Sequence, residues 1–359
     1  MGTDEAAQLE GKVARLRQLL GARGADAVWL DPVASAPSGF RAKAKMVVGG
    51  SVTAPTLGIL DAGRRGVDLS GCGVLDARIR AVFPALKRFI ATAALVPYDV
   101  GARRGELKHV LVTVADDGAL MVRFVLRSTE ALSRIRKHLP ALTAAVPQLT
   151  VVSANLQPLP AAIIEGPDEV VVTQRAELPM RHGDVVLHIR PASFVQTNTA
   201  IATALYAQAA EWVDAVAPQT VWDLYCGAGG FALAVSGPGR DVVGVEASGA
   251  AVESAERGAV GSGVTGVRFE AADATEWALT ASTAPDVVIV NPPRRGIGAR
   301  LASWLEQSSV ETVVYSSCNP VTLARDLESM PSYAVDSARV FDMFPQTRHV
   351  EAMVLLRRA

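Results

Sequence analysis

The chain has 359 residues, half of them hydrophobic, which permits two domains and excludes an intrinsically disordered protein. Its three cysteines, Cys72, Cys226 and Cys318, are too few for a disulfide framework, so we expect a cytoplasmic protein. The net charge of −1 hides a division, because residues 41–137 hold 17 Lys and Arg against 8 Asp and Glu, which favours a polyanion-binding module beside an acidic remainder.

The amino-terminal part of the chain begins with a helix and continues with short strands. Leu and Val recur on one face of residues 5–20, which predicts an amphipathic helix and is not typical of a signal peptide. Residues 39–128 alternate in hydrophobicity, and Asp-Gly at 117–118 predicts a hairpin. Residues 138–164 carry no Asp, Glu, Lys or Arg, but four prolines interrupt them, so we expect strands and turns there and no membrane span.

The carboxyl-terminal part of the chain repeats a pattern of apolar strand, loop and helix. Five apolar segments occur between residues 219 and 320, and a last strand ends the chain. Apolar strands that alternate with helices indicate a parallel sheet covered on both faces. We therefore predict an α/β protein with a basic α+β domain at residues 1–185 and a Rossmann-like domain at residues 186–359.

A glycine-rich loop joins the first of these strands to a helix in "DLYCGAGGFAL". Glycines such as Gly227 let a ligand approach the backbone at a helix amino terminus, although dinucleotide-binding folds use a similar loop. Asp223 before the loop and Glu246 at the end of the next strand suit a ligand with a cationic amino acid part and a ribose diol, such as S-adenosylmethionine (SAM). Asp273, after the third strand, is placed to reach an adenine amino group; the alternative for each acid is a solvated turn residue.

The fourth strand ends in "VVIVNPPRRGIG", which begins its loop at Asn291. Asn-Pro-Pro in this place is typical of methyltransferases that act on nucleobases. Enzymes that methylate base amino groups follow it with an aromatic residue that stacks on the flipped base. Arg294 and Arg295 follow here, which disfavours amino-group methylation and suits a phosphate or a base edge.

Cys318 lies where the fifth strand, "VVYSS", opens into an Asn-Pro turn. Free cysteine is among the most buried residue types, so packing is the more common explanation for a cysteine in such a position. The alternative is a nucleophile at the carboxyl edge of the sheet, where open α/β folds place their ligands.

Eight motifs in order along the chain carry a more specific signal. They are "GFRAKAKMVVGG", "RRGELKHVLV", "VLRS", "RPASFVQTN", "DLYCGAGGFAL", "NPPRRGIG", "YSSCNPVTLARDL" and "DMFPQTRHVEAMVLL". The last four resemble the RNA uracil-C5 methyltransferase family. The first four resemble the branch of that family that methylates 23S ribosomal RNA and lacks a TRAM domain.

The resemblance implies a role for several residues. Cys318 would add to C6 of a uracil, so that C5 can attack the methyl group of SAM, and Glu351 would remove the C5 proton. The family's cofactor positions fall on Gln196, Tyr225, Glu246 and Asn291. The partner would be 23S ribosomal RNA with the target uridine flipped out or single-stranded. We expect a monomer and no membrane association.

The sequence departs from the family pattern in two places. Members of this branch usually bind a four-iron cluster through three early cysteines and a fourth one farther on, and only the fourth, Cys72, is present. Either the true start codon lies upstream or this lineage has dispensed with the cluster. Gln346 also replaces the usual histidine of the "FPHT" motif.

Three rival functions remain. A transfer-RNA uracil-C5 methyltransferase would use the same catalytic residues with another grip on its RNA. An RNA-binding chaperone or assembly factor with incidental methylation is the alternative from another class. A dehydrogenase would share the glycine loop, but it has no use for Cys318 and Glu351.

Overall fold

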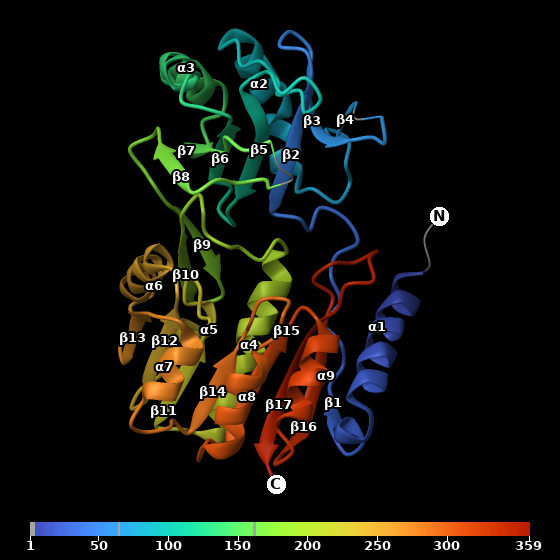
Figure 1. Ribbon diagram of the computed structural model, residues 1–359, viewed down its shortest axis with the longest axis vertical. Helices are drawn as coiled ribbons and strands as arrows, with labels where there is room; N and C mark the ends of the chain where they lie inside the picture. Colours follow the sequence, from blue (N-terminus) through green and yellow to red (C-terminus); the bar gives the residue numbers. More distant parts are fainter. Residues whose placement is uncertain (1–3, 64, 161–162) are drawn as a thin grey trace. The chain divides into compact units, whose positions relative to one another are not determined.

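The computed structural model describes residues 4–63, 65–160 and 163–359 and divides the chain into two compact units (Figure 1). The first unit comprises Met1–Pro37, Arg181–His188 and Asn198–Ala359. The second comprises Ser38–Met180 and Ile189–Thr197. Residues 161 and 162 of the predicted charge-free strand-and-turn stretch lie outside the described part. Residues 138–145 of that stretch belong to the helix α3 (Leu132–Ala145), so the prediction of strands and turns is wrong there.

An eight-stranded sheet forms the centre of the first unit, in the order β1-β16-β17-β15-β14-β11-β12-β13. Its strands are β1 (Val28–Trp29), β11 (Thr220–Leu224), β12 (Asp241–Glu246), β13 (Val267–Ala271), β14 (Val287–Val290), β15 (Thr312–Ser317), β16 (Tyr333–Phe341) and β17 (Glu351–Arg358). Strands β15, β14, β11, β12 and β13 are parallel, whereas β17 runs antiparallel to both of its neighbours. The predicted α/β fold with a Rossmann-like sheet is therefore confirmed.

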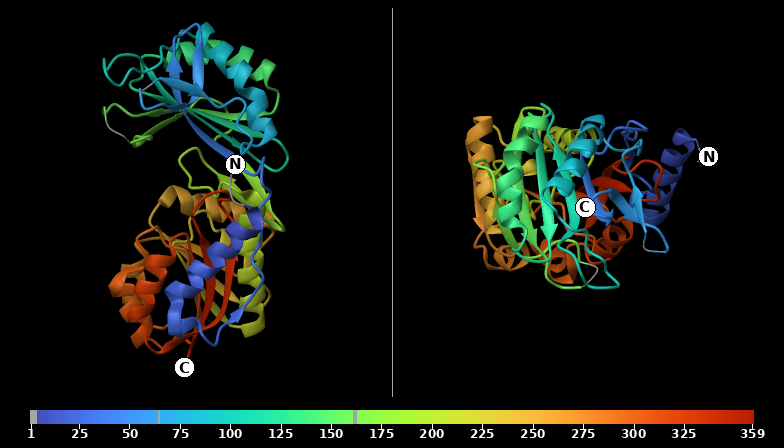
Figure 2. Two further views of the ribbon diagram at one scale, coloured as in Figure 1. Left: turned by 90° about the vertical axis from the view of Figure 1, so that its right-hand side faces the viewer. Right: turned by 90° about the horizontal axis from the view of Figure 1, so that it is seen from above.

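Helices cover both faces of this sheet, as the predicted apolar strands require. They are α1 (Glu5–Leu20), α4 (Thr199–Val216), α5 (Gly230–Ala234), α6 (Gly249–Ser262), α7 (Ala274–Thr280), α8 (Gly298–Gln307) and α9 (Pro320–Glu328), with a short 3₁₀ helix at Gly21–Gly24. Buried residues of α1, α7, α8 and α9 share one core cluster with the sheet. Figure 2 shows α4 on the opposite side of the strands from α7 and α8.

The amino-terminal helix belongs to the first unit, which differs from the predicted boundary at residue 185. Leu16 and Leu20 of α1 are buried in the core of that unit, and β1 pairs in parallel with β16. The Lys12 ammonium, 5% exposed, donates to Asp342 Oδ1 at 2.6 Å and to the Phe344 carbonyl at 2.9 Å. The amphipathic pattern of residues 5–20 is thus explained by burial against a part of the chain more than 300 residues away.

The second unit is built on a seven-stranded sheet in the order β4-β3-β2-β5-β6-β7-β8. Its elements are β2 (Lys43–Gly50), β3 (Pro55–Leu60), β4 (Gly66–Asp68), α2 (Ala77–Thr92), β5 (Leu107–Val114), β6 (Leu120–Leu126), α3 (Leu132–Ala145), β7 (Leu149–Leu156) and β8 (Asp168–Val171). The antiparallel pairing of β5 with β6 confirms the hairpin predicted at Asp-Gly.

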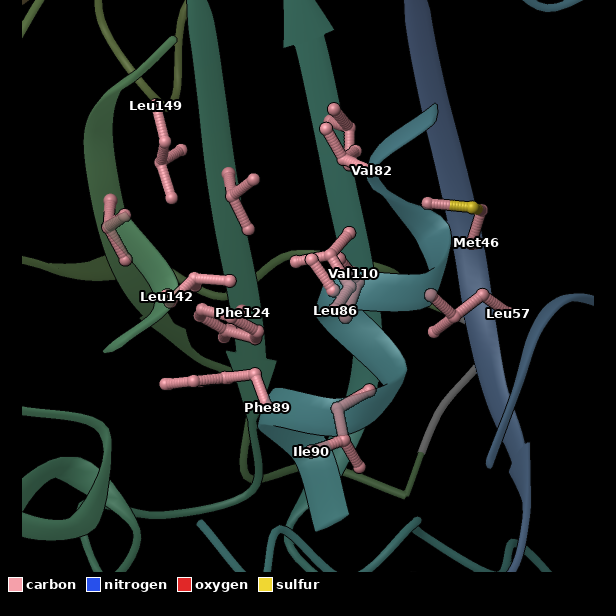
Figure 3. Packing of buried hydrophobic residues seen from close by; sticks show 14 of the residues in the cluster. Met46, Leu57, Val82, Leu86, Phe89, Ile90, Val110, Phe124, Leu142 and Leu149 are labelled. Carbon is pink, nitrogen blue, oxygen red and sulfur yellow. The ribbon is translucent and has the colours of Figure 1, made fainter. Parts of the chain in front are cut away.

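Both helices of the second unit pack on one face of its sheet. Leu86, Phe89 and Ile90 of α2 lie against Val110 and Phe124 of the strands (Figure 3). The Phe89 and Phe124 rings stack with centroids 5.4 Å apart. This core makes the second unit a separate α+β body.

Two further strands, β9 (Leu178–His182) and β10 (Val185–Ile189), pair with each other.

Within the described residues, no helix is both long enough and apolar enough to cross a membrane.

The ion pair of Lys12 with Asp342 gives a test of how α1 is held. We expect Lys12→Met to cost about 3–5 kcal/mol of unfolding free energy, because it leaves the mostly buried Asp342 carboxylate without its partner. Urea denaturation measures the change. The double variant Lys12→Met/Asp342→Leu should recover most of it, and Arg357→Met, which breaks a half-exposed pair with Asp336, should cost less than about 1 kcal/mol. Equal losses in Lys12→Met and Arg357→Met would contradict this account.

Candidate active site

The candidate site begins at the point where the strand order of the first unit reverses. Strand β11 pairs with β12 on one side and with β14 on the other, and both pairings are parallel. Ligands of open α/β sheets bind in the crevice at such a switch point, beyond the carboxyl ends of the strands. The loops that follow β11 and β14 are the glycine-rich loop and the Asn-Pro-Pro-Arg-Arg loop of the sequence.

The glycine-rich loop is held against the end of β12 by Glu246. Its carboxylate accepts the Gly227 N–H at 3.2 Å and the Ser248 N–H at 3.0 Å. Gly227 has φ +56°, a left-handed conformation that glycine adopts without strain. Tyr225 also has a positive φ, +68°, which is uncommon for a bulky side chain and indicates local strain.

Asp273 caps the helix that follows β13. Its Oδ1 accepts the backbone N–H groups of Thr275 and Glu276 at 2.9 and 3.0 Å. The Tyr225 hydroxyl lies 3.3 Å from Thr275 Oγ1, which brings Tyr225 to the same helix terminus. Asp273 thus has a structural role as an N-cap, and its second carboxylate oxygen takes no part in the cap.

Asp223 is a fully buried acid at the end of β11. Its Oδ2 accepts the Ala232 N–H at 2.9 Å, whereas Oδ1 has no hydrogen-bond partner. Burial raises the pKa of this carboxyl to about 8. A buried acid with an unpartnered oxygen is costly to the fold, and such residues cluster at functional sites.

The loop after β14 is shaped by Asp326 of α9. Asp326 Oδ2 accepts the Ile297 N–H and the Tyr315 hydroxyl, both at 2.8 Å. A Cβ at Gly296 would lie 2.1 Å from the same oxygen, so only glycine fits at that position. Asn291, the first residue of the loop, is half-buried directly after the last residue of β14.

Cys318 and Glu351 meet at one edge of the sheet because β15 and β17 are antiparallel. Ser317, the last residue of β15, pairs with Ala352, so Cys318 follows the end of one strand where Glu351 begins the next. Glu351 is 1% exposed. Its Oε1 accepts the Ser316 hydroxyl at 3.3 Å, and its Oε2 has no partner.

The ionisation of this pair is set mainly by burial. Burial raises the pKa of Glu351 to about 7, against a smaller lowering by the Ser316 hydroxyl. Burial also raises the pKa of the Cys318 thiol; the negative charge of Glu351 raises it further, and the Arg294 guanidinium opposes both. The thiol is therefore the resting form of Cys318, beside a carboxyl that titrates near neutral pH.

Arg294 connects the loop after β14 to Cys318 and to the segment that precedes Glu351. The Asn319 side-chain amide donates to the Arg294 carbonyl at 2.9 Å. The Arg294 guanidinium lies 3.5 Å from His349 Nδ1. The loops after β14 and β15 and the start of β17 thus form one continuous edge.

Most of the predicted site residues come together, and two do not. Seven of them lie at the carboxyl edge of the first unit's sheet: Cys318, Glu351, Tyr225, Gly227, Glu246, Asn291 and Asp273. Figure 1 labels the strands β11 to β15, whose ends form this edge. Gln196 belongs to the second unit, two residues before Asn198, whose side chain caps α4. Cys72 lies half-buried against the core of the second unit.

Sequence reasoning missed two residues of this edge. Ser316, which donates to Glu351, and Asp326, which shapes the Arg-Arg loop, are both buried and polar. Their signal in the sequence is weak, because a serine in an apolar strand and an aspartate in a helix are each common. The side chain of Gln346, which replaces the family's usual histidine, donates to the Pro37 carbonyl at 2.9 Å.

Comparison with known proteins identifies the class first. The fold and the loops at this edge are those of Rossmann-like methyltransferases. The family model described as tRNA (Uracil-5-)-methyltransferase matches residues 169–359, more than half of the chain. The chain therefore belongs to the uracil-C5 methyltransferase family.

Curated relatives match almost the whole chain. The 23S rRNA (uracil(747)-C(5))-methyltransferase RlmC of Halothiobacillus neapolitanus is 47% identical over 98% of this chain and 94% of its own length. The protein of the same name from Cronobacter sakazakii is also 47% identical, with the same two coverages. The crystal structure of Pyrococcus abyssi tRNA (uracil-54, C5)-methyltransferase in complex with S-adenosyl-L-homocysteine matches with a TM-score of 0.81 and 25% identity, over 98% of this chain and 83% of that one.

The raised pKa of Glu351 predicts a pH-dependent change in stability. The folded protein holds this proton up to about pH 7, whereas the unfolded chain releases it near pH 4.3. Stability is therefore lost as the pH rises through that window. Glu351→Gln, which does not titrate, should be more stable than the parent at about pH 8 by roughly 3 kcal/mol, and the difference should shrink toward pH 5.

Urea denaturation at several pH values measures this difference. Glu311→Gln serves as the control, since Glu311 is exposed beside the same sheet. A difference between Glu351→Gln and the parent that does not change with pH would show that Glu351 is ionised in the folded protein throughout the range.

Proposed function

We propose that this protein transfers a methyl group from SAM to C5 of a uridine in 23S ribosomal RNA. The observation that carries the proposal is the meeting of Cys318 and Glu351 at one sheet edge, a thiol beside a base that titrates near neutrality. The choice of 23S RNA is supported by two relatives named 23S rRNA (uracil(747)-C(5))-methyltransferase, which are each 47% identical over 98% of the chain.

The edge around β11 suits SAM by the chemistry of its donor set. Glu246 is oriented by two backbone amides and has lone pairs left for a ribose diol. The unpartnered Oδ1 of Asp223 suits the positive amino acid part, which would favour the ionised carboxylate. Asp273 and Tyr225, at the amino terminus of α7, suit the adenine, and Gly227 keeps the backbone accessible. We assign Asn291 and Gln196 to the same cofactor by their match to the family motifs.

Bound SAM supplies an electrophilic methyl group on a sulfonium. The chain's part is to make C5 of uracil nucleophilic, and Cys318 does so. Its thiolate forms a bond to C6, and the electrons of the C5–C6 double bond move to an enolate. C5 of this enolate bonds to the methyl carbon as the bond from that carbon to the sulfonium sulfur breaks, so that S-adenosylhomocysteine leaves. Because the pKa of the thiol is raised, its proton has to pass to solvent water as the substrate binds, and the positive charge of Arg294 favours the thiolate.

Glu351 completes the reaction. Its carboxylate takes the proton from C5, the C5–C6 double bond re-forms, and the bond from C6 to the Cys318 sulfur breaks, so that the thiolate leaves. A base whose pKa lies near the working pH combines a sufficient ionised fraction with a sufficient affinity for the proton. Ser316 holds Oε1, which leaves Oε2 free to face the substrate.

In this proposal the second unit binds the RNA. It contains 19 Lys and Arg residues against 12 Asp and Glu residues. The target base must be unstacked, because C6 is covered in a stacked helix. The protein acts as a monomer, and the reaction takes place in the cytoplasm, where ribosomal RNA is found.

Transfer RNA is the second candidate substrate. It is favoured by the family model and by the structural match to a tRNA (uracil-54, C5)-methyltransferase over 98% of the chain. Mapping 5-methyluridine in ribosomal and transfer RNA of a deletion strain separates the two. Loss of the modification from 23S RNA alone supports our proposal, and loss from transfer RNA overturns its choice of substrate.

An iron–sulfur cluster does not fit the residues that are present. Four thiolates normally hold a four-iron cluster, and this sequence has Cys72 in the second unit and its other two cysteines in the first. Within the described residues, no group of three or more His, Cys, Asp and Glu side chains could hold a metal ion. We therefore give Cys72 no part in the reaction.

The first functional prediction concerns Cys318→Ala. We expect methyl transfer to fall by at least about 10³-fold, because the variant lacks the thiolate that adds to C6, while SAM binding is retained. Tritium release from [5-³H]uridine-labelled RNA measures the first, and calorimetry measures the second. Cys72→Ser is the matched control and should retain most of the activity. Substantial turnover by Cys318→Ala would remove the nucleophile from the mechanism.

Glu351→Gln should stop the reaction one step later. Methylation can occur, but the C5 proton stays, so a covalent protein–RNA adduct should accumulate in the presence of SAM. A denaturing gel with labelled RNA detects it, and Cys318→Ala/Glu351→Gln should show none. Normal turnover without an adduct in Glu351→Gln would show that another group is the base.

A further inference from the structure

We propose that the catalytic unit has a phosphate-binding site of its own, an arginine rim formed by Arg15, Arg294, Arg295 and Arg348, which holds the RNA backbone beside the target uridine. The inference rests on the proposed function for the identity of the nucleic acid. It adds the amino-terminal helix α1 and the loop before Glu351 to the RNA-binding surface, which the charge of the sequence alone assigns to the basic second unit.

Named contacts connect Arg15, Arg294 and Arg348 to the segment around Cys318, and Arg295 follows Arg294 in the same loop. Asn319, next to Cys318, donates to the Arg294 carbonyl at 2.9 Å, and the Arg294 guanidinium lies 3.5 Å from His349 Nδ1. Arg348 precedes His349, and its carbonyl accepts a hydrogen bond from Arg15 at 3.4 Å. The cations therefore extend from the catalytic cysteine to α1 along one surface of the first unit.

All four rim arginines are exposed, and in the described part of the chain none has a carboxylate within 4 Å. This is unusual for their surroundings, since the first unit as a whole contains 16 Lys and Arg residues against 24 Asp and Glu residues, a net charge of −8. Several other exposed arginines of the unit have acidic partners, as Arg300 has in Glu276 and Arg357 in Asp336. Cations left unpaired in an acidic unit suit an anionic ligand.

A groove gives the rim room for a strand of RNA. It has a volume of about 870 Å³ and lies between α1 and residues 346–350, with Arg15 and Arg348 among its lining residues. Lys12 also lines the groove, but Asp342 neutralises its charge, so Lys12 has a structural role in the groove and is not available to a phosphate. Glu5 is the acid at the groove. Two further lining side chains, Gln346 and Thr347, are exposed hydrogen-bonding groups.

The cations on β2 of the basic second unit are less available. The Lys45 ammonium pairs with Glu165 at 2.6 Å. Lys43 is 7% exposed and donates to the Ser193 carbonyl, and burial lowers its pKa to about 8. Net charge along the sequence therefore overstates what β2 offers to a phosphate, and it hides what the acidic unit offers.

Phosphodiester groups are the ligand that this arrangement recognises. A guanidinium presents donors in a planar fork that matches two phosphate oxygens, and phosphate contacts position a nucleic acid without reading its sequence. A base held at Cys318 brings the phosphates of its own and neighbouring nucleotides to within reach of side chains around it. The rim thus positions the target and does not choose it.

The salt dependence of RNA binding tests the proposal. The double variant Arg15→Gln/Arg348→Gln removes two charges that lie outside the reacting pair. Binding of a labelled 23S RNA fragment that contains the target uridine is measured by anisotropy over a range of salt concentrations, without SAM. The slope of log Kd against log salt should become shallower by about 1.4, at roughly 0.7 per phosphate contact for single strands.

Three controls make the outcome specific. Arg15→Lys/Arg348→Lys keeps the charges and should keep the slope, and Arg357→Gln removes an exposed arginine that is paired with Asp336 and should leave the slope unchanged. The binding constant of S-adenosylhomocysteine should not change in the double variant, which shows that the catalytic unit is folded. An unchanged salt slope in Arg15→Gln/Arg348→Gln, or an equal change in Arg357→Gln, overturns the rim.

This test is independent of the reaction assigned to the enzyme. Methyl transfer to uracil C5 by the parent protein decides the proposed function on its own. If the parent does not methylate uracil but the slope changes as expected, the proposed function fails and the rim stands as a site for RNA phosphates. If methylation occurs and the slope does not change, the rim alone fails.

Discussion

The antiparallel pairing of β17 with β15 is the constraint on which the candidate site depends. In a purely parallel sheet only the carboxyl ends of the strands lie at the ligand-binding edge, and each of these ends continues into its own loop. Because β17 runs the other way, its first residue, Glu351, reaches the edge beside the residue that follows β15, Cys318. The nucleophile and the base are more than 30 residues apart in the sequence. Backbone hydrogen bonds between β15 and β17 nevertheless fix their positions relative to each other.

The same edge carries a cost that the fold must offset. Asp223 and Glu351 are each buried with one carboxylate oxygen lacking a partner, and burial raises both pKa values. Burying a polar group without a hydrogen bond costs free energy that only the surrounding core can supply. The ion pair of Lys12 with Asp342 and the leucines of α1 stabilise this part of the unit, which gives the amino-terminal helix a function in holding the segment before Glu351.

Much of the fold and the site could be predicted from the sequence, for reasons that particular residues show. The apolar strands and the glycine loop are local patterns, so the Rossmann-like sheet and the grouping of Tyr225, Glu246 and Asp273 at one edge follow from strand order. The position of α1 could not be predicted, because its partners Asp342 and Phe344 lie more than 300 residues away. The link from Ser316 to Glu351 likewise needs the register of two strands, which no local pattern encodes.

The sequence and the structure give different answers to the question of which cations are available to bind RNA. A count along the chain assigns polyanion binding to residues 41–137, and the proposed RNA grip of the second unit follows from it. A phosphate, however, responds to cations within about one Debye length, some 8–10 Å, and not to the sum over a domain. Pairing decides which cations are available, and it neutralises Lys45 in the basic unit while it leaves Arg294 and Arg348 unpaired in the acidic one. The net charge of −8 on the first unit disfavours RNA, whereas the unpaired arginines beside Cys318 attract it. This difference would direct the strand to the reacting pair, so the negative charge of the unit contributes to positioning as well.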